Sequence, residues 1–426
     1  MIKILKMGEV PKERIFARDN PTANVSDAVA AIVSEVRAGG DKALRDCTER
    51  FDGVKLDSLS VTREEIDEAY KTVGPAFLDV LREAAGNVRA FHQKQVRDGF
   101  VIGKAEDGRV TGQKITPIER VGLYVPGGTA AYPSTVLMDA IPAKIAGVKE
   151  VVMVTPPSAD GKVNPAILAA AYVAGVDKIY KVGGAQAIAA LAYGTESIPK
   201  VDKIVGPGNA FVAEAKKQVF GQVSIDMIAG PSEILIVADG KTNPKYAAAD
   251  LLSQAEHDKN ASAVLVTDSA ALAQAVSDEL ERQIPLLDRA EIARASVDNN
   301  GKIIVADTLD VVIDIANEIA PEHLELCVDN PFDYLDKIRH AGSIFMGRNC
   351  PEALGDYLAG PNHTLPTSGT AKFSSPLSVD DFIKKTQYTY FTADALKSVA
   401  YDVAKFATKE GLTGHAKSAV IRLEEE

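Results

Sequence analysis

The sequence lacks three features that would mark a membrane protein, a nucleic-acid-binding protein or a disulfide-rich secreted protein. No stretch reaches the roughly 18 consecutive apolar residues of a membrane-spanning helix. Lysine and arginine total 47 against 59 acidic residues and are not clustered, which argues against a phosphate-rich nucleic-acid partner. The cysteines, Cys47, Cys327 and Cys350, are odd in number and far apart, so they favour a reducing compartment over a disulfide framework.

The amino-terminal residues 1–6 mix lysine with apolar residues and do not resemble a signal peptide. We therefore expect a cytoplasmic protein whose partner is a small molecule, with no nucleic acid and no membrane involved.

Two common motifs are also missing or incomplete. No zinc-finger spacing is present, so no structural zinc is implied. The dinucleotide fingerprint G-x-G-x-x-G is incomplete, because the run Gly206-Pro-Gly-Asn-Ala-Phe lacks its third glycine. This turn and the Gly183-Gly184 turn would still leave backbone amides free at helix N-termini, an arrangement that favours anionic groups, although plain tight turns fit them equally well.

What the chain does contain is typical of a large soluble α/β enzyme. Its 426 residues, with 46% hydrophobic and 25% charged, predict about two to four domains. Helical patterns occupy residues 26 to about 95, and from Gln113 short β-rich runs alternate with glycine turns and helical segments. Four such units predict a parallel sheet with a nucleotide at its strand carboxyl ends, and a second α/β region follows. The predicted strands and helices of both regions are 120–128 with its glycine turn, 134–146, 150–155, 165–174, 178–182, 187–193, 203–205, 210–220, a pair of strands around a turn in 225–238, 246–257, 263–267, 270–283, 302–305, 308–319 and 343–346.

The tail predicts helical pieces over Asp380–Lys385 and Thr392–Glu410, which would form a small appended arm.

A carboxylate and an imidazole stand side by side at Glu322-His323, after a proline that interrupts a helical run. Adjacent side chains point in different directions, so the pair could address two atoms of one substrate, as a reaction with two proton transfers requires. Taken alone, such a pair in a loop is more often solvated than catalytic.

Possible metal ligands occur at two further places. Gln254 and His257 are three residues apart on one helix and share a face, and Asp356 follows a proline at a helix start and offers a hard oxygen ligand. A merely polar face explains the first pair equally well, and His363, within the rigid Gly360-Pro-Asn-His-Thr turn, fits a local hydrogen-bonding role.

Taken together, these stretches resemble the histidinol dehydrogenase family over about Val121 to His415. The matching strings occur in the family's order and are V121-GLYVPGG, V182-GGAQAIAAL, V205-GPGNAFV, A229-GPSE, D250-LLSQAEH, A320-PEHLEL, G355-DY, G360-PNHTLPT and E410-GLTGH. The family resemblance implies an aldehyde-dehydrogenase-like fold of two incomplete Rossmann-like domains, with a homodimer in which the C-terminal arm completes the neighbouring site.

By that resemblance we expect residues 1–20 to be an extension, 21–123 with 234–377 to form the first domain, 124–233 the nucleotide domain, and 378–426 the arm.

The resemblance also implies the reaction and its residues. L-histidinol would be oxidised through the aldehyde to L-histidine with two NAD and one water, and one zinc ion per subunit would act as a template. His323 would be the base for the alcohol and Glu322 the base for the water. The implied zinc ligands are Gln254, His257, Asp356 and His415; these and Ser232, His323, His363 and Glu410 would contact substrate, and Tyr124, Gln186 and Asn209 would contact NAD.

Two positions beside the site depart from the usual pattern, Lys259 and Thr364, where a proline or glycine and an aliphatic residue are more common. They leave open a related zinc- and NAD-dependent dehydrogenase of another primary alcohol, such as a sulfonated diol. A zinc hydrolase would use the same ligands, but it would give the glycine turns no function. A nucleotide-binding regulator would give the proton-transfer pair no function.

Overall fold

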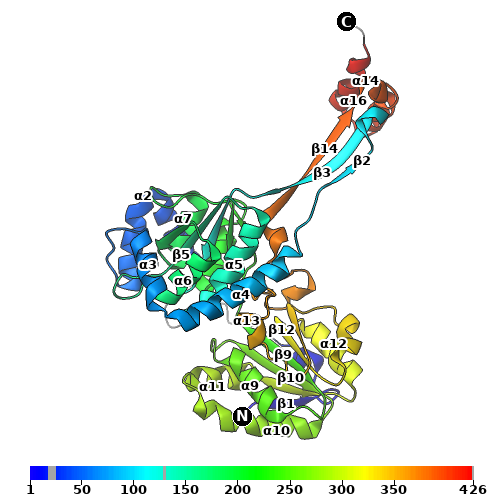
Figure 1. Ribbon diagram of the computed structural model, residues 1–426. Helices are drawn as coiled ribbons and strands as arrows, with labels where there is room; N and C mark the ends of the chain where they lie inside the picture. Colours follow the sequence, from blue (N-terminus) through cyan, green and yellow to red (C-terminus); the bar gives the residue numbers. More distant parts are fainter. Residues whose placement is uncertain (18–24, 128–130, 425–426) are drawn as a thin grey trace. The chain divides into compact units, whose positions relative to one another are not determined.

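The computed structural model describes residues 1–17, 25–127 and 131–424. Contacts divide the chain into two units, one of residues 1–95 and 118–382 and the other of residues 96–117 and 383–426. The first unit contains two parallel sheets with helices on both faces, and the second contains an antiparallel sheet with short helices (Figure 1). The predicted α/β class is therefore confirmed. No helix among the described residues is both long and apolar enough to cross a membrane.

A five-stranded sheet forms one half of the first unit, with all strands parallel in the order β6-β5-β4-β7-β8. One face is covered by α3, α4, α5 and α6, and the other by α2, α7 and α8. The bounds are α2 Ser26–Asp52, α3 Arg63–Thr72, α4 Pro75–Gln93, β4 Arg120–Tyr124, α5 Pro133–Ala146, β5 Glu150–Thr155, α6 Pro165–Ala174, β6 Lys178–Lys181, α7 Gly184–Tyr193, β7 Lys203–Val205, α8 Ala210–Val219 and β8 Ser224–Ile225.

A six-stranded sheet forms the other half, with all pairs parallel in the order β1-β11-β10-β9-β12-β13. Helices α9, α10 and α11 pack on one face, and α12 with residues 5–16 packs on the other. The bounds are β1 Lys3–Lys6, α1 Lys12–Ile15, β9 Glu233–Ala238, α9 Pro244–Ala255, β10 Ser262–Thr267, α10 Ala270–Gln283, α11 Ala290–Asn299, β11 Lys302–Val305, α12 Leu309–Ile319, β12 His323–Cys327, β13 Ser343–Met346 and α13 Ala353–Tyr357.

The hydrophobic cores group the chain differently from the expected domain bounds. Helices α2, α3 and α4 lie within the expected 21–123 segment, yet their apolar faces are buried on the five-stranded sheet and not on the sheet of residues 234–377. Strand β1 lies in the expected 1–20 extension but pairs with β11, so it is an edge strand of the six-stranded sheet.

The second unit corrects the predicted tail. Residues Ile383–Phe391 form a strand, β14, that pairs antiparallel with β3 (Arg109–Pro117), and β2 (Phe100–Ile102) completes the sheet. The helix predicted over Asp380–Lys385 is therefore wrong beyond the single turn at Val379–Phe382. The strand is stabilised by pairing with a segment far away in the sequence, which local periodicity cannot reveal. Helices α14 Ala393–Lys397, α15 Ala400–Lys409 and α16 Thr413–Val420 follow.

Candidate active site

Glu322 and His323 lie at the amino end of β12, between β9 and β13, with His323 in register with Ile234 and Ser343. Both side chains are buried, at 8% and 4% exposure. The loop expected around this pair is thus wrong for His323, which begins a buried strand. Helix α12 ends at Ala320, whose φ of 50° turns the chain directly toward that strand.

The backbone of one residue, Glu233, fixes both members of the pair. Its N–H donates to Oε2 of Glu322 at 2.8 Å, and its carbonyl oxygen lies 2.9 Å from Nδ1 of His323. Because a carbonyl oxygen can only accept, Nδ1 carries a proton, and in the neutral tautomer with this hydrogen bond the lone pair is on Nε2. This Nε2 is buried and has no hydrogen-bond partner among the described residues. A ring held through Nδ1 in this way can offer Nε2 to a proton donor, as a general base does.

Asp356, on α13, lies between two imidazoles. Its Oδ1 is 4.0 Å from Nε2 of His323 and 3.5 Å from Nδ1 of His363. Burial alone would raise the pKa of Asp356, but the hydrogen bond and charge of His363, together with His323, lower it. Burial would in turn lower the pKa of His363, but the same hydrogen bond with Asp356 raises it. Asp356 is therefore a carboxylate, as a hard metal ligand must be.

Gln254 is buried on α9 and is oriented by a residue that the sequence interpretation missed. Its Nε2 donates to Oε1 of Glu352 at 2.5 Å, and Ser253 donates to Oε2 of Glu352 at 2.7 Å. With its NH2 group occupied, the amide oxygen of Gln254 is the end available to a cation. Glu352 is four residues before Asp356, and this spacing on one helical turn was the signal that could have identified it.

His257 lies two residues beyond the end of α9, so the helix predicted over 246–257 is wrong at its last two residues, but His257 belongs to the same electrostatic cluster. Burial lowers its pKa, and the charges of Asp356 and His323 act on it in opposite directions. A neutral imidazole is the form that binds a metal. A second set of possible metal ligands does not include Gln254 or His257. One ligand atom each from His323, Glu352 and Asp356 lies within 4.8 Å of the other two, so these three residues could also hold a metal ion.

The pKa of Glu322 is shifted in the opposite direction from that of Asp356. Burial raises the pKa of Glu322 well above its usual range, and the negative charges of Glu233 and Asp356 raise it further, although the Glu233 N–H opposes them. The adjacent side chains thus differ in character: the imidazole of His323 is anchored through Nδ1, and the carboxyl of Glu322 has a high proton affinity. Such divergence is typical of acid–base sites.

The remaining predicted residues fall into three places. Ser232 directly precedes β9 and lies next to Glu233. Tyr124 and Gln186 are buried in the five-stranded half, where the Tyr124 hydroxyl accepts from Gly184 N–H at 3.1 Å, while Asn209 is exposed and caps α8. Glu410 and His415 belong to the second unit, where both are exposed, at the end of α15 and in α16.

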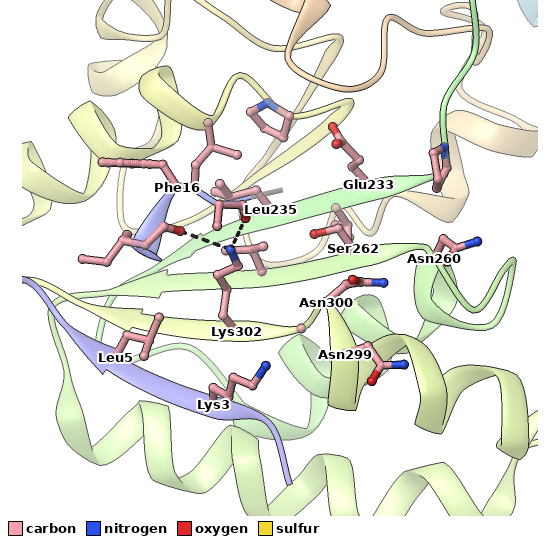
Figure 2. Close-up of a pocket in the computed structure, with 18 residues that line it drawn as sticks. Lys3, Leu5, Phe16, Glu233, Leu235, Asn260, Ser262, Asn299, Asn300 and Lys302 are labelled. Atoms are coloured by element: carbon pink, nitrogen blue, oxygen red, sulfur yellow. Dashed lines mark hydrogen bonds between the residues drawn. The ribbon is translucent and has the colours of Figure 1, made fainter. Parts of the chain in front are cut away.

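A cavity of about 190 Å³ lies at the amino ends of the six-stranded sheet and reaches Glu233 and Pro321, which border the acid–base pair (Figure 2). Lys302 crosses part of it and donates to the carbonyl oxygens of Ile15 at 3.1 Å and Ala17 at 2.7 Å. The ammonium group of Lys302 therefore binds residues 15–17 to the sheet.

Comparison with known proteins identifies the family of this chain. A family model described as histidinol dehydrogenase matches residues 17–423. A histidinol dehydrogenase of Clostridium acetobutylicum is 54% identical over 427 residues, 99% of each chain, and one of Bacillus cereus is 56% identical over 94% of this chain and 93% of its own. A crystal structure of histidinol dehydrogenase from Elizabethkingia anophelis aligns with a TM-score of 0.94 at 38% identity, covering 99% of this chain and 98% of that one. The resemblance seen in the motifs is confirmed, and the chain belongs to the histidinol dehydrogenase family of NAD-dependent oxidoreductases.

Proposed function

We propose that this chain oxidises L-histidinol through L-histidinaldehyde to L-histidine, with two NAD and one water, in the cytoplasm. The observation that carries the proposal is the buried, unpartnered Nε2 of His323 beside Asp356, in a chain of this family. Its three cysteines are free thiols, in keeping with a reducing compartment.

The first oxidation requires the alcohol proton to leave before hydride transfer. His323 accepts this proton at Nε2, while its Nδ1–H stays bound to the Glu233 carbonyl and keeps the ring in place. The electron pair of the O–H bond then forms the carbonyl, and the carbon-bound hydrogen leaves as hydride to the first NAD. The products are the aldehyde, NADH and a proton.

The second oxidation adds water to the aldehyde. Glu322 accepts one proton of this water as its oxygen attacks the carbonyl carbon, giving the singly charged anion of the hydrate. This anion loses a hydride to the second NAD and a proton to the base, leaving the carboxylate. The N–H of Glu233, which donates to Oε2 of Glu322, opposes the effect of burial and favours the carboxylate form that this step needs.

Gln254, His257 and Asp356 would hold the zinc ion, with His415 from a second copy as the fourth ligand. Amide oxygen, neutral imidazole and carboxylate are donors that zinc accepts, and the orientation of Gln254 by Glu352 fits that use. A bound zinc supplies positive charge and orientation for the imidazole and amine of the substrate. Ser232, His363 and Glu410 would complete the substrate contacts.

NAD would bind at the carboxyl ends of the five-stranded sheet, near Tyr124, Gln186 and Asn209. Helices α7 and α8 begin there directly after glycine turns, and the positive ends of their helix dipoles suit a pyrophosphate.

The test is stoichiometric. Incubation with L-histidinol and NAD should yield two NADH for each histidine formed, whereas a ratio of one or none contradicts the proposal. Parallel assays with sulfonated diols decide between histidinol and another primary alcohol, and a hydrolase would form no NADH.

Sharing of sites in a homodimer has its own test. When inactive His323→Gln and His415→Ala variants are unfolded together and refolded as a mixture, heterodimers would contain one intact site. Activity approaching a quarter of the wild-type value supports sharing, because half of the dimers are mixed and each has one of two sites. A mixture as inactive as its parents contradicts it.

A further inference from the structure

A pair of buried polar residues, Asp139 on α5 and Thr364 next to His363, has no role in the chemistry described above. Asp139 is fully buried and Thr364 is 6% exposed. The Thr364 hydroxyl donates to Oδ1 of Asp139 at 3.1 Å, and Oδ2 of Asp139 has no hydrogen-bond partner among the described residues. Thr364 is also a position at which the sequence departs from the aliphatic residue its motif leads one to expect.

Residues of helix α5 form hydrogen bonds with His363 and with both of its neighbours in the chain. Thr135 and Asp139 are four residues apart and share one face of the helix. The Thr135 hydroxyl lies 3.3 Å from Nε2 of His363, and Asp139 binds the next residue, Thr364. The imidazole proposed to contact substrate is therefore set by a helix of the five-stranded half.

Asn362 completes the attachment on the other side of His363. Its Nδ2 donates to the carbonyl oxygen of Met138 at 2.7 Å, and its Oδ1 accepts from the Thr364 N–H at 2.9 Å. Both neighbours of His363 are thus bound to α5, one through Met138 and the other through Asp139.

The opposite side of Asp139 faces the Gly206 turn, which leads to Asn209. A Cβ atom at Gly206 would lie 3.0 Å from Oδ2 of Asp139, so the carboxyl group lies against this turn. The turn itself is rigidly held, because Gly206 N–H donates to Asp226 at 2.8 Å and Lys216, paired with Asp226, donates to the Gly206 carbonyl at 3.0 Å.

We propose that Asp139 and Thr364 are positioning residues whose hydrogen bond fixes His363 relative to the Gly206 turn. One side chain contacts both the segment that carries a substrate-binding imidazole and the turn that leads to a nucleotide contact. The pair thereby sets the distance between the bound alcohol and the nicotinamide of the bound NAD. This inference rests on the proposed function for the roles of His363 and Asn209.

Thr364→Val tests it with little change of shape, because a methyl group replaces the hydroxyl. The KM for histidinol should rise roughly 3- to 10-fold, as expected for one lost hydrogen bond, while the KM for NAD stays within about two-fold. The matched control Thr364→Ser keeps the hydroxyl and should bring the KM for histidinol back to within about two-fold of the wild-type value.

A second measurement does not depend on turnover. The chain has six histidines, so imidazole nitrogen NMR spectra of the 15N-histidine-labelled protein can be assigned with single His→Gln variants. Thr364→Val should shift the His363 ring signals and Thr364→Ser should restore them. If the wild type did not oxidise histidinol, the proposed function would fail while these spectra still tested the positioning pair.

Three results overturn the inference. The first is a His363 spectrum that Thr364→Val leaves unchanged. The second is an equal rise in the histidinol KM for the valine and serine variants, which would reflect packing alone. The third is a fall in kcat and thermal stability with both KM values unchanged, which would mark the pair as purely structural.

Discussion

The two parallel sheets of the first unit place the residues proposed to be functional at opposite ends of their strands. In the five-stranded sheet, Tyr124 is the last residue of β4, and the turns before α7 and α8 follow the carboxyl ends of β6 and β7. In the six-stranded sheet, Ser232, Glu322 and His323 lie at the amino ends of β9 and β12.

The difference shows how two similar sheets can serve different steps, nucleotide binding in one and proton transfer in the other. Carboxyl ends of parallel strands lead into helix N-termini, whose free amides suit an anionic nucleotide. Amino ends provide unpaired backbone groups of the first strand residue, and here those of Glu233 hold a carboxyl and an imidazole. One sheet is thus suited to binding and the other to proton transfer.

The largest expected effect comes from the amino end of β12. His323→Gln should lower kcat for histidinol about 10²- to 10⁴-fold, because the base for the alcohol is lost. The matched control is Asp329→Asn, just beyond the carboxyl end of the same strand, where an exposed ion pair with Lys241 and Arg348 is weakened. We expect this control to keep kcat within about two-fold; equal losses would break the contrast between the two ends.

Glu322→Gln should separate the half-reactions. The amide cannot take the proton of the attacking water, so histidinaldehyde oxidation should fall about 10²-fold or more while alcohol oxidation is partly retained. Stopped-flow NADH formation from histidinol and from histidinaldehyde measures the two steps separately. Equal loss of both would show that Glu322 and His323 act as one unit.

Gly206→Ala tests the nucleotide half. Gly206 has a φ of 112°, and a Cβ atom there would lie 2.2 Å from the Tyr124 carbonyl oxygen. The resulting displacement of the turn should raise the KM for NAD on the order of 10- to 100-fold. Gly221→Ala is the control, since its φ is 97° but a Cβ atom meets nothing within 4 Å. A similar rise in both variants would assign the effect to backbone strain alone.

The smallest effect concerns stability at Asp139. Burial, assisted by Asp226, raises the pKa of Asp139 to about 7, although His363 and Lys216 oppose it. An unfolded aspartate titrates near pH 3.9, so between about pH 4 and 7 the unfolded chain ionises first and rising pH favours unfolding. Asp139→Asn removes this penalty and keeps an oxygen for Thr364.

Its midpoint of thermal unfolding should therefore exceed that of the wild type by a few degrees at pH 8, and by less at pH 5. A gain that is the same at both pH values would mean that Asp139 does not titrate in this range. A loss at pH 8 would show that the ionised carboxylate is stabilised where it lies.

The sequence predicted those parts of the fold whose signals are local. Strands β5, β7, β11 and β13 and helices α6 and α10 have the expected bounds, because each combines an apolar period with a turn or cap nearby. Strand β14 was missed because its residues are mostly exposed and its partner, β3, is more than 250 residues away in the sequence.

The candidate site shows the same limit. Motifs identified the side chains proposed to do chemistry, but not those that orient them. The backbone of Glu233, the carboxylate of Glu352 and the hydroxyl of Thr135 act through contacts between distant segments. Such contacts depend on tertiary packing, within the six-stranded half for Glu233 and Glu352 and between the two halves for Thr135, which no single stretch of sequence contains.

The position of His323 in an interior strand also has a consequence for behaviour on heating. Strand β12 is flanked by β9 and β13 and is buried along its whole length, so its amides should be among the slowest to exchange with solvent. The base cannot leave its place without separating three strands. Heat inactivation should therefore coincide with melting of the whole sheet, with no earlier local loosening of the catalytic imidazole.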